Sequence, residues 1–109
     1  MAKQLSFTYE GENYTLEYTR RTVAEMERNG FVADDIDTKP MTVLPQLFAG
    51  SFLAHHRFVK QNVIDVIYSK MTNKQELIGK LAEMYNEPIM ELVAEPEDKK
   101  GNVEWTASW

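Results

Sequence analysis

The 109-residue sequence contains no cysteine. This absence excludes a disulfide framework, a thiolate nucleophile and any metal site built on sulfur. No apolar run approaches the roughly 20 residues that a membrane-spanning helix requires, so we expect no membrane partner. The opening stretch, MAKQLSFTYEGE, lacks the apolar core of a signal peptide. Together these absences predict a protein of the cytoplasm.

Basic residues are in the minority, with 12 Lys and Arg against 17 Asp and Glu, and the net charge is −5. Proteins that bind nucleic acid usually neutralise phosphates with clustered Lys and Arg. The only basic pairs, Arg20-Arg21 and Lys99-Lys100, are short and have acidic residues nearby. We therefore expect no nucleic-acid partner.

The residues that enzymes use are present but not in catalytic patterns. The glycines are isolated, so no phosphate-binding loop is predicted. The serines lack a nucleophile-elbow context. Asp34, Asp35 and Asp37 lie close together, but the central Gly and terminal Glu of a calcium loop do not follow them. We predict a protein that is not an enzyme, with no catalytic residue, no cofactor and no metal.

The stretch FLAHHRFV contains the only two histidines, His55 and His56. Adjacent helical positions point about 100° apart, whereas a helical zinc pair needs i, i+4 spacing. Positions four residues away on either side hold no usual zinc ligand. We predict that His55 lies at the edge of an apolar stripe with one nitrogen hydrogen-bonded, and that His56 is partly exposed.

The N-terminal segment LSFTYEGENYTLEYT alternates apolar and polar side chains, which indicates two strands. We expect a hairpin over residues 5–19 with a type II′ turn at Gly11-Glu12. This register pairs Tyr9 with Tyr14 and Phe7 with Leu16, and it places the aromatic side chains on one face.

The rest of the chain has helical periodicity and helix-end signals. Thr22 and Glu25 form a capping-box pattern, and Gly30 suits a Schellman ending in which Phe31 contacts Met26. A surface loop is expected over residues 32–41. Thr42 is the expected cap of the next helix, and Thr72 and Gln75 form a second capping-box pattern. Helices are predicted over about 23–29, 42–59, 62–71, 73–86 and 88–94.

The predicted fold class is therefore α+β: an N-terminal antiparallel hairpin packed on a small bundle of about four helices. Residues 1–94 form one globular domain. Residues 95–109 are polar, contain Pro and Gly and lack periodicity, so we expect a flexible tail. This tail carries Trp105 and Trp109, which either dock on the domain or engage a partner.

Three segments in succession, FTYEGENYTLEYTRRTVAEMERNGF, LFAGSFLAHHR and NKQELIGKLAEMYNEPI, carry a resemblance to a known family. Over residues 5–94 the chain resembles the small tail assembly chaperones of tailed phages and prophages of Gram-positive hosts. The resemblance rests on the overall sequence pattern of these segments and includes no catalytic motif.

The resemblance implies a non-enzymatic protein of the host bacterial cytoplasm that binds the tape measure protein and leaves before the virion matures. It also implies help in recruiting the tail tube protein, often through a longer product of a translational frameshift. Lys99-Lys100-Gly101 can be encoded by a run of A that ends in G, which fits a slippery site. The alternatives are a structural tail-completion or connector subunit and a small helical DNA-binding regulator.

A chaperone of this kind needs an apolar, adaptable surface for its client or for self-association. We expect this surface along the exposed flank of the 42–59 helix, with neighbouring and tail residues contributing. The predicted partner-binding residues are Phe52, His56, Val59, Tyr85, Met90, Trp105 and Trp109.

Overall fold

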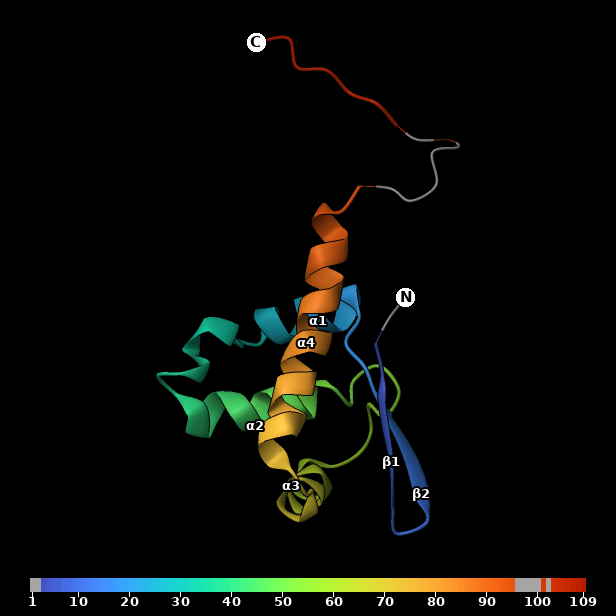
Figure 1. Cartoon of the computed structure of the whole chain (residues 1–109), viewed down its shortest axis with the longest axis vertical. Coiled ribbons are helices and arrows are strands. Elements are labelled where there is room, and N and C mark those ends of the chain that lie inside the picture. Colours follow the sequence, from blue (N-terminus) through green and yellow to red (C-terminus); the bar gives the residue numbers. More distant parts are fainter. Residues whose placement is uncertain (1–2, 96–100, 102) are drawn as a thin grey trace.

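The computed structural model describes residues 3–95, 101 and 103–109. Its α+β architecture is the predicted one: an antiparallel hairpin followed by four helices (Figure 1). The elements are β1 (Leu5–Tyr9), β2 (Glu12–Leu16), α1 (Arg20–Arg28), a 3-10 turn η1 (Ala33–Ile36), α2 (Pro40–Gly50), α3 (Gln61–Lys70) and α4 (Lys74–Val93).

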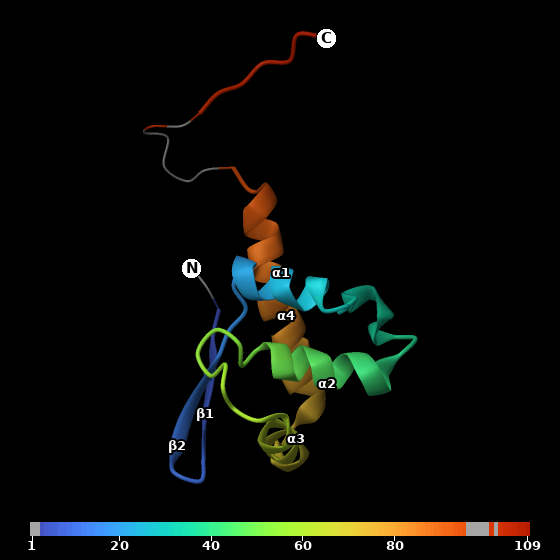
Figure 2. The ribbon, with the colours of Figure 1, turned by 180° about the vertical axis from the view of Figure 1, so that it is seen from behind.

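The 20-residue helix α4 is the longest element, and α1 and α2 both pack against it. Figure 1 and its reverse view, Figure 2, show α1 and α2 crossing α4 at successive levels, with α3 at its N-terminal end. The hairpin lies beside the end of α2. In both views the last turns of α4 extend past α1. This end of α4 therefore has fewer neighbours than its middle.

The hairpin forms with a register that differs from the predicted one. The turn residues are Glu10 and Gly11, which both have positive φ (49° and 81°), as a type I′ turn requires. Phe7 therefore pairs with Tyr14, and Leu5 pairs with Leu16. The predicted partners are wrong by two residues. A shift of two keeps every side chain on its face, so the aromatic residues still point toward the core.

Helix α1 begins earlier than predicted but ends as predicted. Thr19 is the N-cap, and it exchanges hydrogen bonds with Thr22 in place of the expected Thr22–Glu25 box. At the other end Gly30 has φ 94°, and the Phe31 amide donates to the Met26 carbonyl at 3.0 Å. This is the Schellman ending that the local sequence predicts.

Helices α2 and α4 differ most from the predictions. Helix α2 begins at Pro40 rather than after Thr42, and it ends at Gly50 rather than near residue 59. Helix α4 begins after Asn73, which makes no side-chain bond to the helix backbone, rather than with the predicted Thr72–Gln75 box. It also continues through Pro88, so the two predicted helices are one. Pro88 is buried, and this packing offsets the hydrogen bond that a proline removes from a helix interior.

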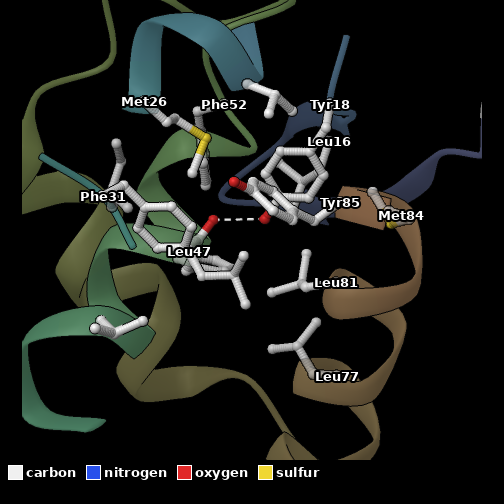
Figure 3. Packing of buried hydrophobic residues seen from close by; sticks show 14 of the residues in the cluster. Leu16, Tyr18, Met26, Phe31, Leu47, Phe52, Leu77, Leu81, Met84 and Tyr85 are labelled. Atoms are coloured by element: carbon white, nitrogen blue, oxygen red, sulfur yellow. Dashed lines mark hydrogen bonds between the residues drawn. The ribbon is translucent and has the colours of Figure 1, made fainter. Parts of the chain in front are cut away.

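The core lies between the hairpin and the four α-helices (Figure 3). Tyr18 follows β2 and is 3% exposed, and its hydroxyl donates to the Leu47 carbonyl at 2.6 Å. This bond satisfies one of the carbonyls that the end of α2 leaves without a helical partner. Burial raises the pKa of Tyr18, so the hydroxyl remains a donor. The buried apolar residues are Leu16, Tyr18, Val23, Met26, Phe31, Val43, Leu47, Phe48, Phe52, Ile64, Ile67, Leu77, Leu81, Met84 and Tyr85.

Candidate interaction surface

Residues 51–60 connect α2 to α3 as a chain of turns and not as a helix. The turns begin because Ser51, which is fully buried, bonds through its hydroxyl to the Phe48 carbonyl, and its own carbonyl accepts the Glu17 amide at 3.0 Å. The predicted 42–59 helix is thus wrong in its second half. The tertiary partners of this segment replace the helical hydrogen bonds that its sequence pattern suggested.

Phe52 is the centre of an aromatic cluster and does not lie on the surface. It is 1% exposed, and its ring lies 5.2 Å from that of Phe48 and 5.9 Å from that of Tyr14, with edge-to-face geometry. Its assignment to a partner-binding flank is therefore wrong. The same holds for Tyr85, which is 5% exposed and packs edge-to-face on Phe31.

The two histidines bind the chain's own hairpin segment. The Nε2 atom of His55 lies 2.6 Å from Oε1 of Glu17. The Thr15 amide donates to Nε2 of His56 at 3.0 Å. Each histidine has a hydrogen-bond partner. His56 is half-buried, which agrees with its predicted partial exposure, whereas His55 is exposed rather than at the edge of the apolar core. Within residues 3–95, 101 and 103–109, no three His, Asp or Glu side chains gather as a metal site would need.

Arg57 anchors the same segment to α1. Its guanidinium donates two hydrogen bonds to Glu25, at 2.9 and 3.0 Å. These bonds hold the pKa of Glu25 below its ordinary value, against the smaller opposing effect of desolvation. The next residue, Phe58, is 94% exposed. Val59 is half-buried against the core.

Glu17 is nearly buried, with a side chain that is 11% exposed. Burial raises the pKa of Glu17, but the hydrogen bonds from His55 and Gln4, together with the charge of His55, lower it by a larger amount. The pKa of Glu17 therefore lies below the ordinary 4.5. A carboxyl whose pKa is lower in the folded chain stabilises the fold above pH 4.5, and this contribution is lost as the pH falls through the folded value.

We therefore expect the free energy of unfolding to fall between about pH 5 and pH 3, with a shallower fall for Glu17→Gln. The glutamine keeps an acceptor for Gln4 but has no proton to gain. Urea midpoints at several pH values measure both slopes. Identical slopes for the two chains would contradict the assigned role of Glu17. Glu25 and Glu83, whose pKa values are lowered by Arg57 and Lys3, account for the slope that remains.

A groove lies between α1 and the C-terminal end of α4. Its volume is about 630 Å³. Both walls use i, i+3, i+4 spacing, which places side chains on one face of each helix. The lining residues are Arg20, Arg21, Val23, Ala24, Glu27, Pro88, Ile89 and Leu92. The floor is therefore apolar, two arginines stand at one end, and a glutamate stands at the other.

The end of α4 beside this groove exposes several large apolar side chains. Met90, a predicted partner-binding residue, is 65% exposed, and the neighbouring Leu92 and Val93 are 61% and 79% exposed. Isolated exposed apolar residues are common, but a run of them beside an apolar groove is typical of an interaction site.

A second pocket, of about 450 Å³, lies beside the 51–60 segment. It is lined by His56 and Val59, both predicted partner-binding residues, and by Met26, Gly50 and Phe52 among others. Arg57 is the one cation in this lining, and it is already paired with Glu25. This pocket therefore offers no unpaired arginine or lysine side chain to a ligand.

The family comparison assigns the chain to a family but gives it no activity. The chain matches, over residues 1–109, the family described as Domain of unknown function (DUF5055). The chain belongs to this family. Neither a curated protein nor a solved structure matches it. The DUF5055 description states no partner, so function has to be argued from the surface itself.

The tryptophans of this DUF5055 chain lie outside the core. Residues 103–109 form no helix or strand, and Trp105 and Trp109 are 81% and 104% exposed. Residues 96–100 and 102, which belong to the predicted flexible tail, lie outside the described residues. No helix in the described part of the chain combines the length and apolar character needed to cross a membrane.

Most of the groove was not predicted from the sequence. The signal was present, because Tyr85, Pro88, Ile89 and Leu92 continue one helical face. The expectation that Pro88 divides two helices hid this continuity. Nothing local in the sequence places Phe58 in solvent, since its exposure depends on the contacts of Arg57 with α1.

Proposed function

We propose that this chain is a non-enzymatic tail assembly chaperone that binds the tape measure protein in the host bacterial cytoplasm and aids tail tube assembly. The observation that carries the proposal is the apolar groove between α1 and α4, together with the exposed Met90, Leu92 and Val93 beside it. The sequence resemblance over residues 5–94 supplies the identity of the client.

The groove suits a helical client. An amphipathic helix binds a groove by inserting side chains spaced at i, i+3, i+4 and i+7. The groove walls present Val23, Ala24, Ile89 and Leu92, which are apolar and small or flexible enough to accept such side chains. The net charge of −5 keeps a chain with this much exposed apolar surface from associating nonspecifically.

Leu92→Asp tests the proposal in co-purification with fragments of the tape measure protein. Leu92 is 61% exposed, so the fold should survive, whereas binding should fall about 30-fold or more if Leu92 is a central contact. Val66→Asp is the matched control, because Val66 is 44% exposed on α3 and does not line the groove. Circular dichroism and urea midpoints check that both variants fold.

Unchanged binding of Leu92→Asp would place the client surface elsewhere. Absence of co-purification with the native chain would overturn the function itself. Mass spectrometry of purified virions separates the chaperone from the alternative, a structural tail-completion or connector subunit, because a chaperone does not persist in the particle.

The nucleotide sequence of the gene tests the proposed recruitment of the tail tube protein through a frameshifted product. A slippery run of A at Lys99-Lys100-Gly101 and an overlapping downstream frame are expected, and a run that cannot slip would remove the frameshift product. Self-association is tested separately, by light scattering of the purified chain at several concentrations.

A further inference from the structure

The groove between α1 and α4 has two arginine side chains at one end. Arg20 and Arg21 lie at the start of α1, where no acidic residue occupies the first turn. Both are exposed, and within the described part of the chain neither forms an ion pair. An occupant with an apolar side chain for the floor and a carboxylate for the arginines would complement both features.

The chain carries such a segment itself. Val103, Trp105 and Trp109 are 90%, 81% and 104% exposed, and Glu104 lies directly before Trp105. An exposed tryptophan gains more by burial than almost any other side chain, since it can remove well over 150 Å² from water. Residues 95–109 contain four acidic and two basic side chains, so the segment as a whole is acidic.

The connection is long enough. Helix α4 ends at Val93, one residue after the groove residue Leu92, and ten residues separate Ala94 from Trp105. Ten extended residues span up to about 33 Å, which allows the chain to turn back along the last turns of α4. The attachment point lies at the groove, so the entropy of closing this loop is small.

We infer that the groove between α1 and α4 binds Trp105 of the chain's own C-terminal segment, with Glu104 facing Arg20 and Arg21. The indole lies against Ile89 and Leu92 on one side and Val23 on the other. The pocket beside residues 51–60 is a poorer host, because its arginine is already bound by both carboxylate oxygens of Glu25.

Docking in this position makes the segment a reversible cover for the client surface. A short linker holds the segment at an effective concentration of about 1 mM. If the segment binds the groove with a Kd of about 0.1 mM, it lowers the apparent affinity for a client about tenfold. This competition rests on the proposed function, whereas the docking does not.

Tryptophan fluorescence tests the docking without any client. Trp105 and Trp109 are the only tryptophans, so Trp109→Phe leaves a chain whose emission comes from Trp105 alone. Docking predicts emission at shorter wavelength and weaker acrylamide quenching than in the urea-unfolded chain, independent of protein concentration. Arg20→Glu with Arg21→Glu in this background is expected to restore the emission of an exposed indole.

The double reversal should not unfold the chain, because acidic residues in the first turn of a helix stabilise it. Lys60→Glu with Lys80→Glu is the matched control, since it changes the net charge equally at positions that do not line the groove. This control should leave the Trp105 emission of the docked state unchanged.

Three results of the fluorescence experiment would overturn the inference. Exposed Trp105 emission in the folded chain shows that the segment does not dock. A buried emission that appears only at high concentration assigns the segment to a second copy, and one that survives Arg20→Glu with Arg21→Glu assigns it to another surface. Docking without client binding would leave the inference standing and remove the proposed function, and the reverse result would do the opposite.

Discussion

Phe52→Ala is expected to lower the free energy of unfolding by about 3–5 kcal/mol, the range for truncating a buried phenylalanine. Phe52 is 1% exposed, and its ring contacts those of Phe7, Tyr14 and Phe48 edge-to-face. The substitution removes these aromatic contacts and leaves a cavity where the hairpin meets α2. For a domain of this size such a loss is a large share of total stability.

The matched control is Phe58→Ala, six residues along the same segment. Phe58 is 94% exposed, so its truncation should change stability by no more than about 0.5 kcal/mol. Urea midpoints for the two variants give the comparison. Equal effects would mean that residues 51–60 do not adopt the turns described.

Gly50→Ala is expected to destabilise the chain by about 1 kcal/mol, because the cost of adding a methyl group beside Met26 exceeds the gain in helix propensity. Gly50 is the last residue of α2, and a Cβ atom there would overlap the sulfur and terminal methyl of Met26. Met26 is 5% exposed between α1 and α2, so its side chain would have to leave its packed position.

A double-mutant cycle isolates this contact. In a Met26→Ala background the methyl group of Gly50→Ala meets no obstacle, so the substitution should become neutral or stabilising. Gly79→Ala is the control in α4: nothing lies within 4 Å of its Cβ position, and the change should stabilise by about 0.5–1 kcal/mol. Additive effects of Gly50→Ala and Met26→Ala would show that the two residues do not touch.

The parts of the fold that sequence reasoning predicted are those that local chemistry determines. The Schellman ending at Gly30 depends on six neighbouring residues, and it formed as expected. The face of each hairpin strand follows from alternation alone. The register of the hairpin does not follow from alternation. A turn at Glu10-Gly11 and a turn at Gly11-Glu12 both contain Gly11, and both keep the alternating side chains on the same faces.

The parts that sequence reasoning missed depend on distant residues. The segment after Gly50 has a helical apolar pattern, yet His55 and Arg57 bind partners 38 and 32 residues away in the sequence. These contacts turn the chain, bury Phe52 and expose Phe58. Of the predicted partner-binding residues, Met90 and the two tryptophans lie on the surface, while Phe52 and Tyr85 belong to the core.

The contacts of the 51–60 segment with β2 also bear on aggregation. The backbone amides of Thr15 and Glu17 alternate along the outer side of the hairpin, and they donate to His56 and to the Ser51 carbonyl. A free strand edge presents such amides to other chains and invites intermolecular sheet formation. In this chain an imidazole and a loop carbonyl occupy these two amides, so the β2 edge is less open to pairing with a strand of another chain.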